Sequence, residues 1–145
     1  MKVILQRSNY SFVEVDNKKV GEISHGLVVL VGFTEGDSIS EIDYIVDKIL
    51  NLRIFNDENG IMNKSVLDVD GNILSISQFT LYANTLKGRR PSYALAMNGI
   101  EAKKLYILFN QKLKEKINVE TGVFGADMKV SIQNDGPVTI VLESR

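Results

Sequence analysis

Apolar residues in the first part of the chain follow the spacing of β-strands. They alternate or run without interruption in four segments, residues 2–7, 11–15, 20–23 and 26–33. Alternation is typical of strands with one buried face, and the uninterrupted run at residues 26–33 is typical of a strand buried on both faces. Together these segments predict an antiparallel meander that leads to a central strand.

Two later segments repeat their apolar residues at helical spacing. The first lies within residues 38–55, where Ser38 and Glu41 form a capping box at the start. The second covers residues 101–117. One face of each helix is apolar and is expected to be buried. The residues on these faces are Ile42, Ile45, Val46, Ile49 and Leu52 in the first helix, and Leu105, Phe109, Leu113 and Ile117 in the second.

Strand patterns also occur after each helix. Residues 65–81 resemble two short strands joined at Asp70-Gly71, which is a hairpin signal. Residues 126–133 and 137–144 alternate as two more strands, with Asn134–Gly136 as the turn between them. This mixed order predicts one α+β domain that takes in all 145 residues. We expect a mostly antiparallel, barrel-like rolled sheet with the two main helices packed outside.

The composition narrows the possible chemistry. The chain has no cysteine and a single histidine, His25. Disulfides, thiolate nucleophiles and cysteine-based zinc sites are therefore excluded, and we expect no metal and no cofactor. His25 lies between two predicted strands and is interpreted as a turn residue. A chain so poor in side-chain catalysts either is not an enzyme or works with backbone groups and help from its substrate.

Charge and hydropathy limit the possible partners. The net charge of −1 gives no general attraction to nucleic acid or to an anionic membrane. The longest apolar run, residues 27–33, is far shorter than the roughly 20 residues of a membrane span. Contact with a polyanion must therefore come from a local patch, such as the basic loop at residues 85–91. We expect a soluble, cytoplasmic protein without a membrane partner.

One candidate site lies in the segment SISQFTLYA, residues 75–83. Ser77, Gln78 and Thr80 gather there beside Phe79, at the end of a predicted strand. Several polar side chains at a strand end could form a site. Alternatively, the segment is an ordinary strand with a solvated face.

The second candidate is NDGPVT, residues 134–139, in which Pro137 follows a glycine. A proline beside a strand removes a ladder hydrogen bond, so it needs an edge, a bulge or a function. With a trans bond, Gly136-Pro137 is only the end of a hairpin. With a cis bond, the carbonyls of Gly136 and Pro137 could point in a similar direction and hold one ammonium group. Residue types alone leave both interpretations open.

The motif SQFTL at residues 77–81, together with NDGPVT, resembles the paired signature of the D-aminoacyl-tRNA deacylase family of the bacterial and eukaryotic type. Gln6-Arg7 and residues 53–63, 87–93 and 121–139 match the same family in order and spacing. A sister family that edits L-alanyl-tRNA has different residues in both motifs. This chain has serine and phenylalanine in the first motif and no histidine after the second, so it resembles the D-specific branch. The sister branch is kept as an alternative.

The resemblance implies a homodimer that hydrolyses the ester bond of D-aminoacyl-tRNA and of mischarged glycyl-tRNA. Gly136 and Pro137, joined by a cis bond, would reach into the pocket of the partner and exclude L-residues by steric overlap. Arg7 would hold this element in place. The N–H of Phe79, with that of Thr80, would stabilise the oxyanion.

Other residues receive roles from the same resemblance. Ser77 and Gln78 would shape the pocket, and Phe124 and Met128 would line the site of the terminal adenine, unless they are plain strand core. The hydroxyl of Thr80 is a conceivable nucleophile, but neither motif holds a histidine or lysine that could activate it. The 2′-OH of the terminal adenosine would activate water instead.

The basic loop supplies the expected contact with the rest of the substrate. Lys87, Arg89 and Arg90 could approach tRNA phosphates. The expected partners are aminoacyl-tRNA and a second copy of the chain, and no binding to DNA is expected. A rival from another class is a non-catalytic nucleic-acid-binding dimer on the same fold, because a fold alone does not settle function.

Overall fold

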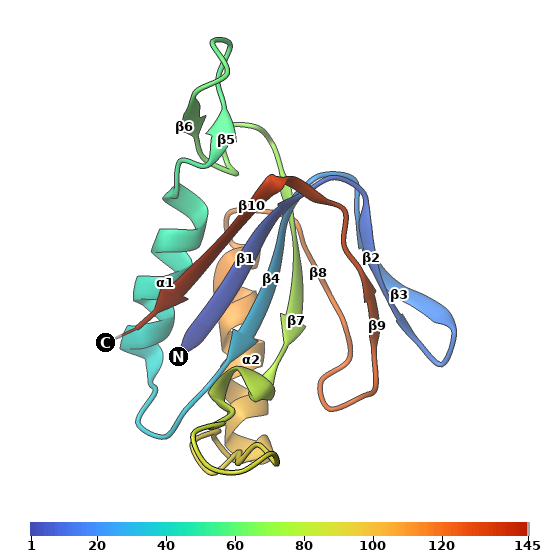
Figure 1. The fold of residues 1–145 in the computed structure, drawn as a ribbon. Helices are drawn as coiled ribbons and strands as arrows, with labels where there is room; N and C mark the ends of the chain where they lie inside the picture. The colour runs from blue at the N-terminus through green and yellow to red at the C-terminus, as the bar shows by residue number, and fades with distance from the viewer. Residues whose placement is uncertain (145) are drawn as a thin grey trace.

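Residues 1–144 are described by the computed structural model, which holds two α-helices, a short 3₁₀ helix and ten strands within that range (Figure 1). The strands are β1 (Lys2–Ser8), β2 (Ser11–Val15), β3 (Lys18–Ile23), β4 (Gly26–Gly32), β5 (Phe55–Asn56), β6 (Met62–Lys64), β7 (Asn72–Ser77), β8 (Val119–Thr121), β9 (Lys129–Ser131) and β10 (Asn134–Glu143). The helices are α1 (Ile39–Asn51), η1 (Phe79–Tyr82) and α2 (Gly99–Lys114).

A five-stranded sheet with the order β10-β1-β4-β7-β8 forms the centre of the molecule. β1 pairs antiparallel with both β10 and β4, whereas β7 pairs parallel with β4 and β8. The prediction of a central strand is confirmed, because β4 is the third of the five strands and most of its residues are buried. The α+β class and the mostly antiparallel pairing are confirmed as well.

The prediction of a meander and of a barrel-like sheet is wrong. β2 does not pair with β1, because both edges of β1 are already occupied by β4 and β10. β2 and β3 instead join β9 in a separate three-stranded sheet, and β5 with β6 forms a small hairpin. Within residues 1–144 the strands therefore form three sheets and do not close into a barrel.

Both helices lie behind the five-stranded sheet in Figure 1 and cover one of its faces. The main core fills this layer with fully buried residues from β1, β4, α1 and α2, among them Leu5, Val29, Ile45 and Phe109. The opposite face is covered only in part. There Val13 and Ile23 of the three-stranded sheet, with Val28, Leu74 and Ile76, form a smaller second core.

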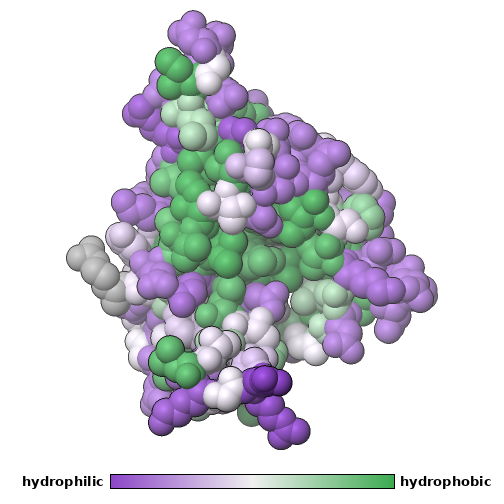
Figure 2. Space-filling model, in the orientation of Figure 1, coloured by the Kyte–Doolittle hydropathy of each residue, from purple (hydrophilic) through white to green (hydrophobic). Residues whose placement is uncertain are grey.

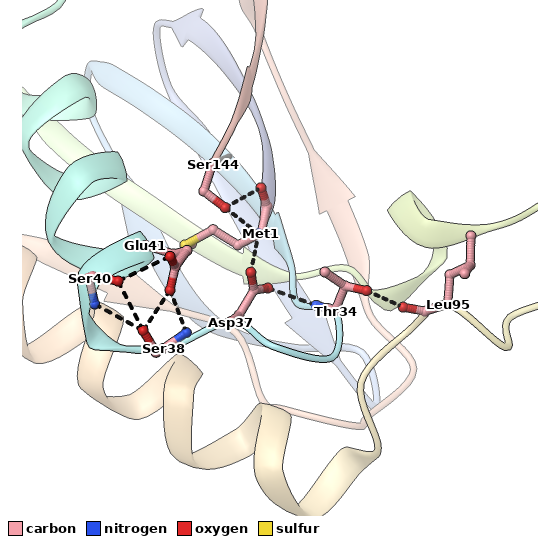
Figure 3. Close-up of polar contacts among 8 residues, drawn as sticks. All are labelled: Met1, Thr34, Asp37, Ser38, Ser40, Glu41, Leu95 and Ser144. Carbon is pink, nitrogen blue, oxygen red and sulfur yellow. Dashed lines mark hydrogen bonds and ion pairs between the residues drawn. The ribbon is translucent and has the colours of Figure 1, made fainter.

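The start of α1 confirms the predicted capping box, which Figure 3 draws together with its surroundings. The N–H of Ser40 donates to the hydroxyl of Ser38 (3.3 Å), and the N–H of Ser38 donates to Glu41 Oε2 (2.8 Å). The hydrogen bond from the Ser38 hydroxyl is the main cause that lowers the pKa of Glu41 to about 2. The helix ends at Asn51, so the predicted face is confirmed except that Leu50 is buried in place of Leu52.

The second helix starts earlier than predicted, at Gly99, because the side chain of Asn98 caps it by accepting from the N–H of Glu101 (3.1 Å). It also ends earlier, at Lys114. Leu105 and Ile117, expected to be buried, are only partly buried at the edge of the core. The buried face holds Ala102, Tyr106, Phe109, Asn110 and Leu113.

The hairpin predicted at Asp70-Gly71 is absent from residues 65–81. Only Asn72–Ser77 is a strand, and it pairs in parallel with β4. The residues before it form turns, in which the N–H of Ser65 donates to Asp68 Oδ2 (2.8 Å) and the N–H of Asp68 donates to Ser65 Oγ (3.2 Å). These local bonds satisfy backbone groups that a strand would have used.

Asn134–Gly136 is not a hairpin turn either, because these residues begin β10. β9 pairs with β2, while β10 pairs with β1 and brings Asn134 opposite Ser8. The amide of Asn134 donates to the carbonyls of Arg7 (3.0 Å) and Val138 (3.1 Å) and so closes the irregular start of the strand. The Gly136-Pro137 bond is cis.

The two ends of the described chain meet beside the loop before α1 (Figure 3). The amino group of Met1 lies 2.5 Å from Asp37 Oδ1 and 2.5 Å from Ser144 Oγ. Asp37 also accepts from the N–H of Thr34 (2.8 Å), and the hydroxyl of Thr34 donates to the carbonyl of Leu95 (2.6 Å). These contacts connect the segment that contains Leu95 to the start of β1 in the five-stranded sheet.

No helix in residues 1–144 is long and apolar enough to cross a membrane. In the same range, no group of three or more His, Asp or Glu side chains is placed to hold a metal ion.

Candidate active site

A cavity of about 510 Å³ opens at the carboxyl end of β7. Three parts of the chain meet around it: the end of β7 with the first residue of η1, the start of α2 with Met97 before it, and the segment from Phe124 to Val130, which reaches into β9. The lining residues are Ile76, Ser77, Gln78, Phe79, Met97, Gly99, Ala102, Phe124, Gly125, Ala126, Asp127, Met128 and Val130.

Five of the predicted site residues, Ser77, Gln78, Phe79, Phe124 and Met128, line this one cavity. They come from two segments more than forty residues apart, and the parallel pairing of β7 with β8 brings these segments together. Phe124 and Met128 therefore face a cavity rather than a closed strand core. The roles expected for the five residues stay predictions.

The backbone turns sharply where β7 ends. The N–H of Gln78 donates to the carbonyl of Val31 (2.7 Å), and the chain then enters η1. Gly32 allows this close approach, because a Cβ at Gly32 would lie 2.7 Å from the carbonyl oxygen of Gln78. Within residues 1–144, the N–H groups of Phe79 and Thr80 have no hydrogen-bond acceptor. Two main-chain donors are thus unengaged beside the cavity.

Thr80 follows the lining residues but does not itself line the cavity. Its hydroxyl accepts a hydrogen bond from the side-chain amide of Gln78. Within residues 1–144 no histidine or lysine side chain contacts this hydroxyl. His25, as predicted, lies in the bend between β3 and β4, where its carbonyl accepts from the N–H of Asn72 (3.0 Å).

Sequence analysis missed Tyr106, which contacts both the strand and an aromatic residue of the cavity. The hydroxyl of Tyr106 donates to the carbonyl of Ser75 (2.8 Å), and its ring lies against that of Phe124 with the centroids 5.7 Å apart. Burial raises the pKa of Tyr106, so the phenol stays protonated as a donor. The position of Tyr106, three residues before Phe109 on the predicted buried face, is the signal that could have identified it.

Gly122 leaves space for the side chain of Met128, which forms part of the cavity wall. A Cβ at Gly122 would overlap the Sδ of Met128 and would lie 3.3 Å from Ile76. Met97, Ala102 and Asp127 also line the cavity and were missed as well. A helical pattern predicts which residues are buried, but not that some of them border an empty space.

The Gly136–Pro137 element lies elsewhere. Strand register places Asn134 level with Ser8, Gly26 and Asn72, and hence at the amino end of β7, whereas the cavity lies at its carboxyl end beside Ser77. The six residues of β7 separate the two places by roughly 17 Å. Gly136 and Pro137 are exposed and do not line the cavity of their own chain.

Arg7 lies next to this element and contacts it. Its side chain is only 9% exposed, and Nη1 donates to the carbonyl of Ile54 (2.9 Å). Nε lies 3.1 Å from Asp135 Oδ2 in an ion pair. A Cβ at Gly136 would lie 3.0 Å from Nη2 of Arg7, and the φ of +118° at Gly136 also favours glycine. The predicted neighbourhood of Arg7 and Gly136 is therefore present.

The predicted phosphate contacts, Lys87, Arg89 and Arg90, are all exposed on the loop between η1 and α2. The loop is closed at its base by two hydrogen bonds between Asn84 and Ser92, of 2.8 and 2.9 Å. These bonds hold the two ends of the loop together.

The fold and the cavity define a small α+β protein whose candidate site is built from main-chain donors rather than from a catalytic triad. A family model described as D-Tyr-tRNA(Tyr) deacylase matches residues 4–143, and the chain belongs to this family.

Curated relatives extend over the whole chain. The D-aminoacyl-tRNA deacylase of Clostridium novyi (strain NT) is 54% identical, and the match covers 100% of this chain and 98% of the relative. The D-aminoacyl-tRNA deacylase of Clostridium tetani (strain Massachusetts / E88) is 57% identical with the same coverage.

Two solved structures share the fold. The c-Myc DNA Unwinding Element Binding Protein superposes with a TM-score of 0.95 and 43% identity, covering 100% of this chain and 99% of that one. A structure described as a probable eukaryotic D-amino acid tRNA deacylase superposes with a TM-score of 0.82 and covers 97% of both chains. At 20% identity the second structure supports the fold alone.

Proposed function

We propose that this chain hydrolyses the ester bond of D-aminoacyl-tRNA, and of mischarged glycyl-tRNA, to release tRNA and the amino acid. Relatives named for this activity align along the entire chain at 54–57% identity. The observation that carries the proposal is the place of the SQFT motif, where the unengaged N–H of Phe79 lies beside a cavity of about 510 Å³. We expect the enzyme to work in the cytoplasm, where aminoacyl-tRNA is used.

The proposed chemistry relies on main-chain groups. When water attacks the ester carbonyl, the oxyanion accepts hydrogen bonds from the N–H of Phe79 and, beside it, of Thr80. One preorganised donor of this kind contributes about 3–4 kcal/mol to the stability of the transition state. The 2′-OH of the terminal adenosine activates the water, because neither motif holds a histidine or lysine that could act as the base. Ser77 and Gln78 shape the pocket, and Phe124 and Met128 receive the adenine.

A homodimer supplies the part of the site that one chain lacks. On the sheet face opposite the helices, Val141, Ile4 and Leu30 form one cross-strand row. Val141 is 57% exposed, and Figure 2 shows this apolar area facing the viewer with polar residues around it. Large exposed apolar areas typically mark interaction sites. We place the second copy on this face.

The symmetry of such a dimer would bring the two distant elements together. With a two-fold axis across the strands, the Gly136–Pro137 end of one copy comes to lie over the cavity end of the other. The Gly136–Pro137 element then acts as the chirality gate, and Arg7 holds it. An L-side chain would overlap this element. Keeping errors near one in ten thousand requires about 5.5 kcal/mol of discrimination.

The direct test compares D-Tyr-tRNA with L-Tyr-tRNA as substrates of the purified protein. We expect rapid release of D-tyrosine, with L-Tyr-tRNA decaying at its spontaneous rate. Equal rates for the two substrates, or no turnover of either, would contradict the proposal. Cleavage of L-Ala-tRNA with D-substrates untouched would select the sister branch instead.

A second candidate function rests on one comparison. The structure with a TM-score of 0.95 bears the name of a protein that binds a DNA unwinding element. A non-catalytic nucleic-acid-binding dimer is the corresponding alternative for this chain. The net charge of −1 gives no general attraction to DNA, and Lys87, Arg89 and Arg90 are a small patch. Binding of DNA at physiological salt, without any deacylation, would favour this alternative.

A further inference from the structure

We propose that Phe79 and Tyr93 form a stacking platform for the unpaired nucleotide that precedes the terminal adenosine of the tRNA. The inference rests on the proposed function, because the terminal adenosine must first occupy the cavity. It adds a binding site for the single-stranded part of the substrate outside the cavity.

The platform consists of two exposed aromatic rings in contact. The ring centroids of Phe79 and Tyr93 lie 5.1 Å apart, and the ring planes meet at 68°, an edge-to-face pair. Phe79 is 58% exposed and Tyr93 is 41% exposed. An edge-to-face pair leaves the faces of the edge-on ring open, and every nucleobase can stack on such a face.

One ring of the pair lines the cavity, and the other lies outside its lining. Phe79 lines the cavity at the end of β7, whereas Tyr93 does not line it and contacts the ring of Phe79. A strand whose last nucleoside lies in the cavity would place its preceding base near these rings. One base step in a stacked strand is about 3.4 Å. Phe79 lines the cavity and its ring contacts that of Tyr93, so the base next to a bound terminal nucleoside would meet this pair first.

The main chain on both sides of Tyr93 is held in place before any ligand arrives, and its ring contacts that of Phe79. The bonds between Asn84 and Ser92 close the loop on one side of it. On the other side, the hydroxyl of Thr34 donates to the carbonyl of Leu95 (2.6 Å), and the N–H of Met97 donates to the carbonyl of Phe33 (3.0 Å). A preorganised ring loses little conformational entropy on binding.

Charge favours a nucleic acid strand over an apolar partner. The basic loop with Lys87, Arg89 and Arg90 closes at Ser92, next to Tyr93. A second cavity, of about 430 Å³, shares Met97 with the first and is lined by the carboxylates of Glu35, Asp37 and Glu101. Asp37 and Glu101 are ion-paired with the Met1 amino group and with Lys104, but the cavity lining holds no lysine or arginine. Phosphates are therefore attracted toward the basic loop rather than toward this cavity. Exposed aromatic rings on which bases can stack, next to cationic side chains, are typical of sites for single-stranded RNA.

The experiment uses two substrates that differ only in the preceding nucleotides. One is adenosine esterified with D-tyrosine, and the other is the trinucleotide CCA esterified in the same way. Stacking of one base contributes about 1–3 kcal/mol, so kcat/KM of the unaltered protein should be about 5- to 150-fold higher for the trinucleotide. Tyr93→Leu keeps the apolar bulk without the ring and should remove most of this difference. Tyr93→Phe should keep it.

Tyr10→Ala is the matched control, because Tyr10 is exposed to a similar extent (46%) but lies before β2, in contact with Phe12. It should leave the ratio between the two substrates unaltered. Phe79 is unsuitable for this test, because its main chain belongs to the proposed oxyanion site. If Tyr93→Leu lowers kcat/KM equally for both substrates, or for neither, the platform is refuted.

Failure of the proposed function would look different. In that case the unaltered protein would hydrolyse neither ester. The platform would then be tested by the affinity for uncharged CCA trinucleotide, measured by fluorescence anisotropy of a 5′-labelled strand. Weaker binding by Tyr93→Leu than by Tyr93→Phe would support the platform, and equal binding would refute it.

Discussion

The two ends of the five-stranded sheet are built in different ways. At the carboxyl end of β7, a tight turn leaves main-chain donors beside a cavity of about 510 Å³. At the other end, the buried Arg7 forms an ion pair with Asp135 in an exposed segment around Gly136, which lines no part of that cavity. One end can receive a ligand, and the other can only project from the surface. If the site needs both ends, as we propose, two copies of the chain must contribute to it.

The largest effect is expected from a substitution at the carboxyl end of β7, next to the cavity. Phe79→Pro removes the main-chain N–H, while proline is tolerated at the first position of a helix. The residue before it, Gln78, already has φ −145° and ψ 81°, outside the α region that proline disfavours. We expect kcat on D-tyrosyl-adenosine to fall about 100- to 1000-fold, as for the loss of one oxyanion donor.

Phe79→Ala is the control for this change, because it removes the same ring but keeps the N–H. Its kcat on D-tyrosyl-adenosine should stay within about threefold of the unaltered protein. A similar loss for the alanine and proline variants, with unfolding excluded by circular dichroism, would show that the N–H of Phe79 does not act on the oxyanion.

The next effect concerns the projecting end. Arg7→Ala removes the hydrogen bond to Ile54 and the ion pair with Asp135, so the segment around Gly136 loses its fixed position. A displacement of about 1 Å can cost about 100-fold in rate. We expect a loss of this order in kcat/KM on D-Tyr-tRNA.

Arg7→Lys should not restore the rate, because lysine lacks the planar group that bonds Ile54 and Asp135 at once. Asp135→Asn, whose side chain is 46% exposed, should cost much less. Full activity of Arg7→Ala would mean that this end of the sheet has no part in the reaction.

A smaller effect is expected from a wall of the cavity. Gly122→Ala places a methyl group where the Sδ of Met128 lies. Because methionine is flexible, we expect Met128 to move into the cavity and to raise KM for D-tyrosyl-adenosine about tenfold, with kcat less affected. Gly99→Ala is the control: its added methyl group also lies on the wall of the cavity but would have no atom within 4 Å. The KM of this variant should therefore change less than twofold. Equal KM values for the two variants would argue that the adenosine does not contact Met128.

The smallest effect concerns Thr80. Its hydroxyl accepts a bond from Gln78 but lies outside the cavity lining. Thr80→Ala should therefore retain kcat on D-tyrosyl-adenosine within about threefold, since a neutral hydrogen bond contributes only about 1 kcal/mol. Single-turnover kinetics would measure this. A loss of several orders of magnitude in a folded variant would make Thr80 the nucleophile.

Local patterns in the sequence predicted the parts of the fold that depend on neighbours along the chain. The capping box of Ser38 and the buried run of β4 are both confirmed. Turn signals at Asp70-Gly71 and Asn134–Gly136 were misleading, because a turn does not specify the strand with which its flanks pair. The pairing of Ser8 with Asn134 joins residues far apart in the chain and leaves no local trace.

The candidate site was likewise predicted where local motifs define it and missed where it depends on contacts between distant residues. Family motifs pointed to Ser77–Phe79, Phe124 and Met128, which line one cavity. Met97 and Tyr106 were missed, because their positions depend on how α2 packs behind β7. The distance between Gly136 and the cavity could not be predicted either, since it follows from strand register.

The most direct test of a site shared between two chains mixes two inactive variants. Phe79→Pro and Arg7→Ala chains are unfolded together, refolded in equal amounts and assayed on D-Tyr-tRNA. In half of the dimers, one cavity is intact and faces an intact Gly136 segment, so about a quarter of the original activity should return. If both ends served the same chain, the mixture would stay as inactive as its components.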